Sequence, residues 1–221
     1  SPLSLAGADF DGDGRSDLVT GGGSNGMLSL FRNISAEGGK LRVLPAVNTP
    51  FGGTLRDMAA IDFDGDGKKD LLAVDSDGSR LLRLRGQGDG SFVPESPVSL
   101  PTNPRALTLF DVDGDEDLDV AAASQTTPSV TILRNDAGVY SVLSTTPIGA
   151  GLNLIAAGDL DGDGRADLAV GDVTGKSVIL LRNASNQGGL EAMATLTLPA
   201  AALAVAAGDT NGDGVAEVFV G

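Results

Sequence analysis

Short apolar runs separated by segments rich in Gly, Asn and Asp recur along the chain, always in the same order. One run precedes an acidic segment, a second follows it directly, and a third and a fourth come after further turn-forming residues. Runs of this length between turn residues are typical of β-strands. The pattern predicts first strands at 3–8, 55–61, 105–110, 153–158 and 202–208, second strands at 17–22, 70–75, 119–124, 167–172 and 217–221, third strands at 27–33, 80–86, 129–135 and 177–183, and fourth strands at 40–47, 91–100, 139–145 and 190–198.

Two landmarks repeat with the same step. The acidic segments begin at 9, 62, 111, 159 and 209, and an arginine near the end of each third strand stands at 32, 85, 134 and 182. Both series advance by 53, 49 and 48 residues. Four strands in a repeat of about fifty residues are typical of β-propeller blades. The sequence therefore predicts one all-β propeller domain over 1–221, with repeats near 1–53, 54–103, 104–150, 151–200 and 201–221, the last being half a blade.

Two details refine the strand assignment. The first strands are rich in alanine and glycine, which suits a crowded position near a propeller axis. At 200–207 the same richness leaves a helix open, but alignment with the other first strands favours a strand. Prolines at 45, 94, 97 and 147 fall in or just after the fourth strands, where an outer edge tolerates them.

Composition excludes several kinds of chemistry. The chain has no Cys, no His and no Trp, which removes disulfides, thiolate sites, the usual zinc ligand and the commonest general base. A formal net charge of −15 disfavours nucleic acids and anionic membranes as partners. No apolar run approaches the roughly 20 residues that span a bilayer, so we expect no membrane insertion. The first ten residues lack the layout of a signal peptide and give no location.

The acidity is concentrated in five nine-residue segments: loop one (9–17), loop two (62–70), loop three (111–119), loop four (159–167) and loop five (209–217). Each places oxygen-bearing side chains at positions 1, 3, 5 and 9. Odd positions of a curled loop turn to the same side, Gly at position 6 permits a positive φ, and position 7 adds a backbone carbonyl. Such hard oxygen ligands suit Ca²⁺ better than Mg²⁺.

We therefore predict up to five calcium sites. The predicted ligands are Asp9, Asp11, Asp13, Arg15 and Asp17 in loop one; Asp62, Asp64, Asp66, Lys68 and Asp70 in loop two; Asp111, Asp113, Asp115, Asp117 and Asp119 in loop three; Asp159, Asp161, Asp163, Arg165 and Asp167 in loop four; and Asp209, Asn211, Asp213, Val215 and Glu217 in loop five, where Arg15, Lys68, Asp117, Arg165 and Val215 act through backbone carbonyl oxygens.

Alternatives to these sites are weaker. An EF-hand needs a Glu at position 12 and flanking helices, whereas position 12 here is Thr20, Ala73, Ala122, Val170 or Val220 between predicted strands. A solvated Asp-Gly hairpin turn remains open for any single loop, but five in register disfavour it.

The five loops also differ from one another. Loop three has Glu116 in place of Gly and Asp117 at position 7, which predicts a curl that is either strained or differently charged. Loop five has the neutral Asn211 at position 3, so we expect its site to be the weakest.

These motifs resemble the FG-GAP/VCBS repeat family, the calcium-binding blade repeats also seen in integrin α-chain propellers. The resemblance rests on D-x-D-G-D-G-x-x-D-L at 9, 62 and 159, third strands such as "SVILLRN", and "GDGSF" at 88–92. It implies a propeller with calcium in the hairpin between the first two strands of each blade, and an extracellular or cell-surface setting.

The number of repeats departs from the family, which commonly builds rings of about seven blades. The chain is a fragment of a longer chain, a small ring with an incomplete blade, or one of several chains that complete one another, and we favour the first two. A half blade would expose a strand edge through which chains could self-associate.

Three functions follow from these observations. The first is a non-catalytic binding or adhesion scaffold stabilised by calcium, with a protein or glycan ligand. A calcium-dependent lectin is an alternative, although sugar sites usually use aromatic faces and the chain has one Tyr and seven Phe, most of which we assign to the core. A propeller portion of a secreted polysaccharide-processing enzyme is a third possibility. No nucleophile motif is present and the clustered carboxylates are committed to metal, so we do not expect an enzyme.

Two smaller signals remain. The sequons at Asn33 and Asn183 are predicted to lie in a surface turn, either as glycosylation sites or simply as turn residues. The recurring arginines either form a basic ring that meets a ligand or, as we favour, each make a repeated contact within their own blade, to an acidic loop or to a backbone carbonyl.

Overall fold

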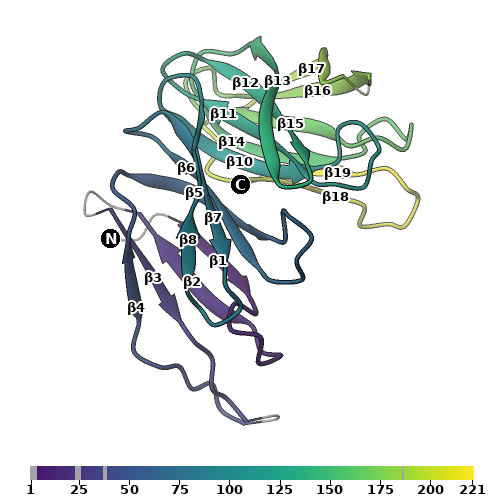
Figure 1. The fold of residues 1–221 in the computed structure, drawn as a ribbon. Helices are drawn as coiled ribbons and strands as arrows, with labels where there is room; N and C mark the ends of the chain where they lie inside the picture. The colour runs from purple at the N-terminus through teal and green to yellow at the C-terminus, as the bar shows by residue number, and fades with distance from the viewer. Residues whose placement is uncertain (1–3, 23–25, 37–38, 186) are drawn as a thin grey trace. The chain divides into compact units, whose positions relative to one another are not determined.

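A computed structural model describes residues 4–22, 26–36, 39–185 and 187–221 of the chain (Figure 1). The chain divides into two compact units, Ser1–Ser99 and Leu100–Gly221, which are taken separately below. The described residues form nineteen β-strands and no helix. Nothing in this described part has the helical length and apolarity that a membrane crossing requires.

The first unit contains two antiparallel sheets in which the strands follow one another in chain order. The sheets consist of β1 (Ser4–Ala8), β2 (Asp17–Gly21), β3 (Met27–Phe31) and β4 (Val47–Pro50), and of β5 (Leu55–Ile61), β6 (Asp70–Asp75), β7 (Arg80–Gly86) and β8 (Phe92–Pro94), with β9 (Val98–Ser99) also paired to β7. This meander of four strands is the form expected of a propeller blade.

The second unit repeats this sheet twice and adds a two-stranded sheet. Its strands are β10 (Pro104–Phe110), β11 (Asp119–Ser124), β12 (Ser129–Asp136) and β13 (Val139–Pro147); β14 (Leu152–Gly158), β15 (Asp167–Asp172), β16 (Ser177–Ser185) and β17 (Gly189–Thr197); and β18 (Val205–Gly208) with β19 (Glu217–Val220). The predicted architecture of four full repeats and half of a fifth is therefore confirmed. The helix considered at 200–207 does not form, since β18 occupies the end of that stretch.

Two fourth strands differ from the prediction. The strand predicted at 40–47 is wrong, because β4 lies at Val47–Pro50. Residues before it pair back toward β3 instead: Ile34 N donates to Arg42 O at 2.8 Å and Leu44 N donates to Arg32 O at 2.9 Å. Pro45 follows and has no N–H with which to continue the pairing. The strand predicted at 91–100 is split into β8 and β9 by residues 95–97, which include a second proline.

The core lies on both faces of the second strands. Every residue of β6, β11 and β15 is buried. Within the first unit β1 packs against β5, and within the second β14 packs against both β10 and β18. Contact between successive first strands explains their alanine and glycine content, because small side chains allow close approach.

The second residue of loops one, two and three helps to anchor the loop. Phe10 is buried and meets Phe92 edge to face, with ring centroids 5.4 Å apart and planes at 70°. Phe63 and Val112 are buried at the same position in loops two and three. An apolar side chain at position 2 therefore fixes the start of these three loops, whose tips at positions 4 to 6 are exposed.

Candidate metal centres

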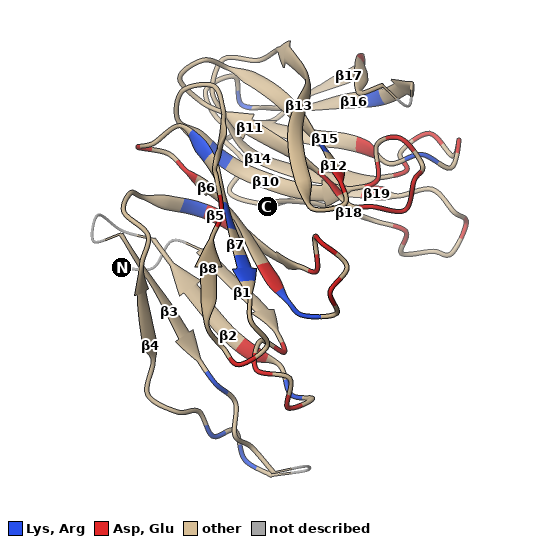
Figure 2. Cartoon of the chain, in the orientation of Figure 1, with Lys and Arg blue, Asp and Glu red and all other residues tan. Residues whose placement is uncertain are grey.

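The five acidic loops join the first and second strands of the five sheets, and Figure 2 shows acidic residues, in red, concentrated along the chain at these hairpins. Loop one connects β1 to β2, loop two β5 to β6, loop three β10 to β11, loop four β14 to β15, and loop five β18 to β19. The antiparallel register ends each time with position 9 paired to the residue before position 1, for example Ala8 with Asp17. The sheet therefore fixes both ends of each loop.

Backbone N–H groups wrap the position-1 carboxylate. In loop one Asp9 Oδ1 accepts from Gly12 N and Asp9 Oδ2 from Gly14 N, both at 2.8 Å. The same pair of bonds is made by Asp111, Asp159 and Asp209. Positions 4 and 6 have positive φ in all five loops. Glycine adopts this conformation without strain, which explains the D-G-D-G pattern.

Loop three departs from this pattern as predicted. Glu116 occupies position 6 with φ 71°, a left-handed conformation that costs a residue with a Cβ roughly 1–2 kcal/mol. The loop still closes in the same way, because Glu116 N donates to Asp111 Oδ2 at 3.0 Å. The expected strain in this curl is therefore present.

The carboxylates at positions 1, 3 and 5 converge. Ligand oxygens lie within 4.8 Å of one another in Asp9, Asp11 and Asp13, in Asp62, Asp64 and Asp66, and in Asp111, Asp113 and Asp115. In loop four the converging set is Asp159, Asp161 and Asp167. Asp11 Oδ1 is buried and has no hydrogen-bond partner. Close, partly desolvated carboxylates with an unused oxygen fit a divalent cation bound by hard oxygen ligands.

The remaining predicted ligands are placed differently. The position-5 carboxylate accepts a hydrogen bond from the position-7 N–H at 2.9 Å in every loop. The side chains of Arg15, Lys68 and Arg165 at position 7 turn back to pair with this same carboxylate. In loop five Asp209, Asn211 and Asp213 make the curl, but no set of three converging carboxylates forms there among the described residues.

Position 9 has a structural role that the sequence did not reveal. Asp17, Asp70, Asp119 and Asp167 are at most 3% exposed. In each, one oxygen accepts from the N–H of position 2 and the other from the residue sixteen positions further on, near the end of the third strand. For Asp119 these donors are Val112 N and Asn135 N, both at 2.7 Å. The position-9 carboxylate therefore ties the loop to the third strand, whether or not it also binds metal.

Burial without a cation raises the pKa of several loop carboxyls. Desolvation raises the pKa of Asp119 to about 6, and Asp113 and Asp115 add to the shift against two stabilising N–H bonds. Burial raises the pKa of Asp70 and Asp167 in the same way. The buried carboxylates are thus held in an unfavourable charge state at neutral pH, which a bound cation would relieve.

The recurring arginines contact the position-3 carboxylate of their own repeat. Arginine Nη1 lies 3.7 Å from the Oδ2 atom of Asp11, 3.9 Å from that of Asp64 and 3.8 Å from that of Asp113. Arg182 Nε lies 2.8 Å from Asp161 Oδ2. The contact within a blade is confirmed.

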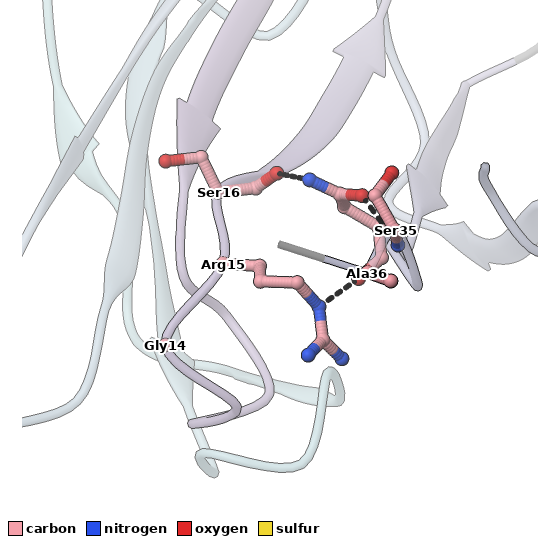
Figure 3. Close-up of a pocket in the computed structure, with 6 residues that line it drawn as sticks. Gly14, Arg15, Ser16, Ser35 and Ala36 are labelled. Carbon is pink, nitrogen blue, oxygen red and sulfur yellow. Dashed lines mark hydrogen bonds between the residues drawn. The ribbon is translucent and has the colours of Figure 1, made fainter. Parts of the chain in front are cut away.

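Two pockets border these loops. The first, of about 570 Å³, lies beside loop one (Figure 3). There Arg15 Nε donates to Asn33 O at 2.8 Å, and Asn33 Nδ2 donates to Ser16 O at 3.1 Å. The second, of about 280 Å³, is lined by residues of loops three and four, which are therefore neighbours. Nothing in either pocket adds a ligand to the predicted sites.

The two sequons are not equivalent. Asn33 is partly exposed, but the surface turn predicted for Asn183 is wrong. Asn183 lies in β16, is fully buried, and its Nδ2 donates to Val112 O at 3.2 Å. It joins the third strand of one blade to the loop of the preceding one. The turn predicted after Asn33 includes residues 37 and 38, which lie outside the described residues.

Comparison with solved structures supports the fold. BBS1N in complex with ARL6DN, soaked with lead, is 16% identical with a TM-score of 0.70 over 100% of this chain and 62% of that one. A Lactobacillus plantarum protein is 15% identical with a TM-score of 0.67, over 99% of this chain and 64% of that one. A putative 6-phosphogluconolactonase from Bacteroides fragilis is 13% identical with a TM-score of 0.68, over 97% of this chain and 57% of that one. The chain thus spans less than two thirds of these proteins, and identities this low indicate the fold alone. No curated protein matches the chain in sequence.

A family model agrees with the repeat found in the sequence. The model described as an FG-GAP-like repeat matches residues 9–73, 62–122, 111–170 and 159–220. Each match begins at the first aspartate of an acidic loop and ends within the second strand of the next repeat. The chain therefore belongs to the FG-GAP-like repeat family, and its four-stranded sheets are the blades of a β-propeller fold.

Proposed function

We propose that the protein is a non-catalytic, calcium-stabilised propeller scaffold that binds another macromolecule. The observation that carries this proposal is the convergence of three carboxylates, with oxygens within 4.8 Å of one another, at positions 1, 3 and 5 of loops one to three and at positions 1, 3 and 9 of loop four. Three like charges this close repel unless a cation neutralises them. Oxygen-only donor sets favour Ca²⁺ over the transition metals and over Mg²⁺, which keeps several of its waters.

The residues that would hold the ion are the aspartates at positions 1, 3 and 5, with the position-7 carbonyl and the position-9 carboxylate as the remaining predicted ligands. Bound calcium would supply charge neutralisation and a link between the two strands of the hairpin. The protein itself supplies the curl, since the position-1 carboxylate already accepts two backbone N–H bonds. The ion therefore needs little rearrangement of the backbone on binding.

We assign the protein an extracellular or cell-surface location, where calcium is abundant enough to fill such sites, and a protein ligand. A lectin gains no support from the one tyrosine. Tyr140 is buried, and its hydroxyl donates to Leu118 O at 3.1 Å, so its ring is not available to stack on a sugar. The lactonase named among the solved structures shares 13% identity and carries no inference about catalysis.

Calcium binding is tested by calorimetry and thermal unfolding of the chelator-stripped chain, with Mg²⁺ as the matched ion. Each site filled at 100 times its Kd would add about 2.7 kcal/mol, or roughly 2–4 °C in Tm for each kcal/mol. We expect Ca²⁺ to raise Tm by more than Mg²⁺ does, and the double variant Asp11→Asn/Asp13→Asn to lose part of the rise. An unchanged Tm and no heat of binding in millimolar Ca²⁺ would refute the proposal.

A further inference from the structure

We propose that arginine and lysine side chains paired with the ligand carboxylates give the loops different calcium affinities. Among the four full repeats, loop three then fills first and loop four last. This inference rests on the calcium binding proposed above. Calcium affinity depends on how much negative charge the ligand loop presents, so any arginine or lysine already paired with a ligand carboxylate competes with the ion.

Loop four is the most fully compensated. Arg165 Nη2 lies 2.5 Å and Arg182 Nη2 2.8 Å from Asp163 Oδ2, while Asp163 Oδ1 accepts from Arg165 N. Arg182 also pairs with Asp161. Both oxygens of the position-5 carboxylate are thus engaged, and Asp163 is not in the converging set of this loop, which contains Asp167 instead. Calcium must displace these contacts before it can use all the ligands.

Loop three is the least compensated. Position 7 is Asp117, so the cation that pairs with position 5 in loops one, two and four is replaced by a further acid. Asp115 makes no ion pair within the described part of the chain, and the nearest arginine, Arg134, lies 3.8 Å from Asp113. Glu116 adds another carboxylate at position 6. Loop three therefore has six acidic side chains and one arginine in ion-pair contact with them among the described residues, whereas loop four has four acidic side chains and two such arginines.

Loops one and two also set four acids against two cations, as loop four does, but their third-strand arginines lie farther from the carboxylates. Arg15 and Lys68 each pair with the position-5 carboxylate, but the third-strand arginines are 3.7 and 3.9 Å from position 3. The four third-strand arginines are 37–45% exposed, whereas their aspartate partners are 13–21% exposed. Within the described part of the chain, Arg182 alone among these four arginines is within ion-pair distance of two carboxylates of its loop.

The chain contains its own reporter for loop three. It has no Trp and a single Tyr, and the Tyr140 hydroxyl is bonded to the carbonyl of Leu118 in that loop. Tb³⁺ substitutes for Ca²⁺ at oxygen sites and emits when a nearby aromatic ring is excited. Tyrosine-sensitised Tb³⁺ emission therefore reports mainly on loop three, while calorimetry or native mass spectrometry counts all the ions bound.

The test titrates the chelator-stripped full chain with Tb³⁺. We expect most of the sensitised emission to appear with the first equivalent, and Tyr140→Phe to abolish it. Emission that grows evenly over all equivalents, or only after other sites have filled, would overturn the ranking and leave calcium binding intact. Absence of any bound ion by calorimetry and mass spectrometry would overturn the calcium proposal itself.

Variants separate charge from ligand geometry. Asp117→Arg gives loop three the position-7 cation of its neighbours and should weaken its Tb³⁺ affinity about tenfold, with Asp117→Asn intermediate. Arg182→Gln should tighten the weakest of the four sites by a similar factor in a Ca²⁺ titration, and Arg182→Lys should restore most of the original affinity. Circular dichroism checks that each variant keeps its β-sheet. Unchanged affinities in folded Asp117→Asn and Arg182→Gln proteins would contradict the role of these charges.

Discussion

The buried carboxyl of Asp119 should make the metal-free protein less stable as the pH rises toward neutrality. Its pKa is raised from 3.8 to about 6 in the folded chain, with desolvation as the main cause. A folded-state pKa above the unfolded value means that the native state binds the proton more tightly. The stabilisation that comes from this tighter proton binding by Asp119 is therefore fully present below about pH 4 and is lost as the pH rises through about 6.

The magnitude follows from the size of the shift. About two pKa units correspond to roughly 3 kcal/mol over the whole range, and roughly 1 kcal/mol of this falls between about pH 5 and pH 7. Raised pKa values at Asp70 and Asp167 act in the same direction. The pKa of Asp66 is lowered, mainly by the hydrogen bond from the N–H of Lys68, so this carboxyl is ionised throughout the interval from about pH 5 to pH 7. It therefore does not change the stability over that interval.

Urea unfolding in a chelator at about pH 5 and pH 7, followed by circular dichroism, measures this change. Asp119→Asn removes the titrating group and keeps one oxygen to accept an N–H, so its stability should vary less with pH than that of the wild-type chain. Asp66→Asn is the matched control, and it should keep the wild-type slope. In saturating Ca²⁺ the wild-type slope should shrink, because the cation favours the ionised form. Equal slopes in Asp119→Asn and the wild type would refute the assignment.

Three further outcomes are expected. Asn183→Ala removes a buried hydrogen bond to Val112 O and should lower the free energy of unfolding by about 1–3 kcal/mol in urea titrations, whereas Asn33→Ala should have a smaller effect. Glu116→Gly relieves a positive φ and should raise the free energy of unfolding of the calcium-free protein by roughly 1 kcal/mol; a loss of stability there would argue against strain. Expressed in a glycosylating host, the folded chain should carry no glycan at Asn183 by peptide mass mapping.

Features that depend on neighbouring residues were predictable from the sequence. The curl of each loop follows from Asp at position 1 and residues with positive φ at positions 4 and 6, all within nine residues. The strands flanking the loops are equally local, since their apolar runs stop at turn residues. The strain at Glu116 could be foreseen for the same reason, because position 6 requires a left-handed backbone whatever the rest of the chain does.

Features that depend on distant partners were not predictable. The fourth strand of the first repeat shifts to β4 because residues up to Leu44 pair with the end of β3, a choice that local propensity does not encode. Asn183 resembles a turn residue by sequence, yet the preceding blade buries it against Val112. The second role of Asp119 depends on Asn135, sixteen residues away in another strand.

Two adjacent residues at the end of the third strand in each full blade reduce the charge repulsion within the acidic loop. In blade four the N–H of Asn183 donates to the position-9 carboxylate of Asp167, while Arg182, one residue earlier, pairs with the position-3 carboxylate of Asp161. The other full blades repeat this double tie. It offsets two of the four clustered charges with groups from a neighbouring strand, so repulsion within the loop does not prevent folding.

Loop five differs from the other four loops at positions 3 and 9. Position 3 is the neutral Asn211, which needs no arginine, and position 9 is Glu217, whose longer side chain bonds within the loop, to Thr210 N at 2.9 Å and to Asn211 Nδ2 at 2.7 Å. The position-9 carboxylate of loop five is therefore held by contacts inside the hairpin. In each full blade the third-strand arginine contacts the position-3 carboxylate, and a third-strand N–H donates to the position-9 carboxylate. Together these contacts hold the loop closed.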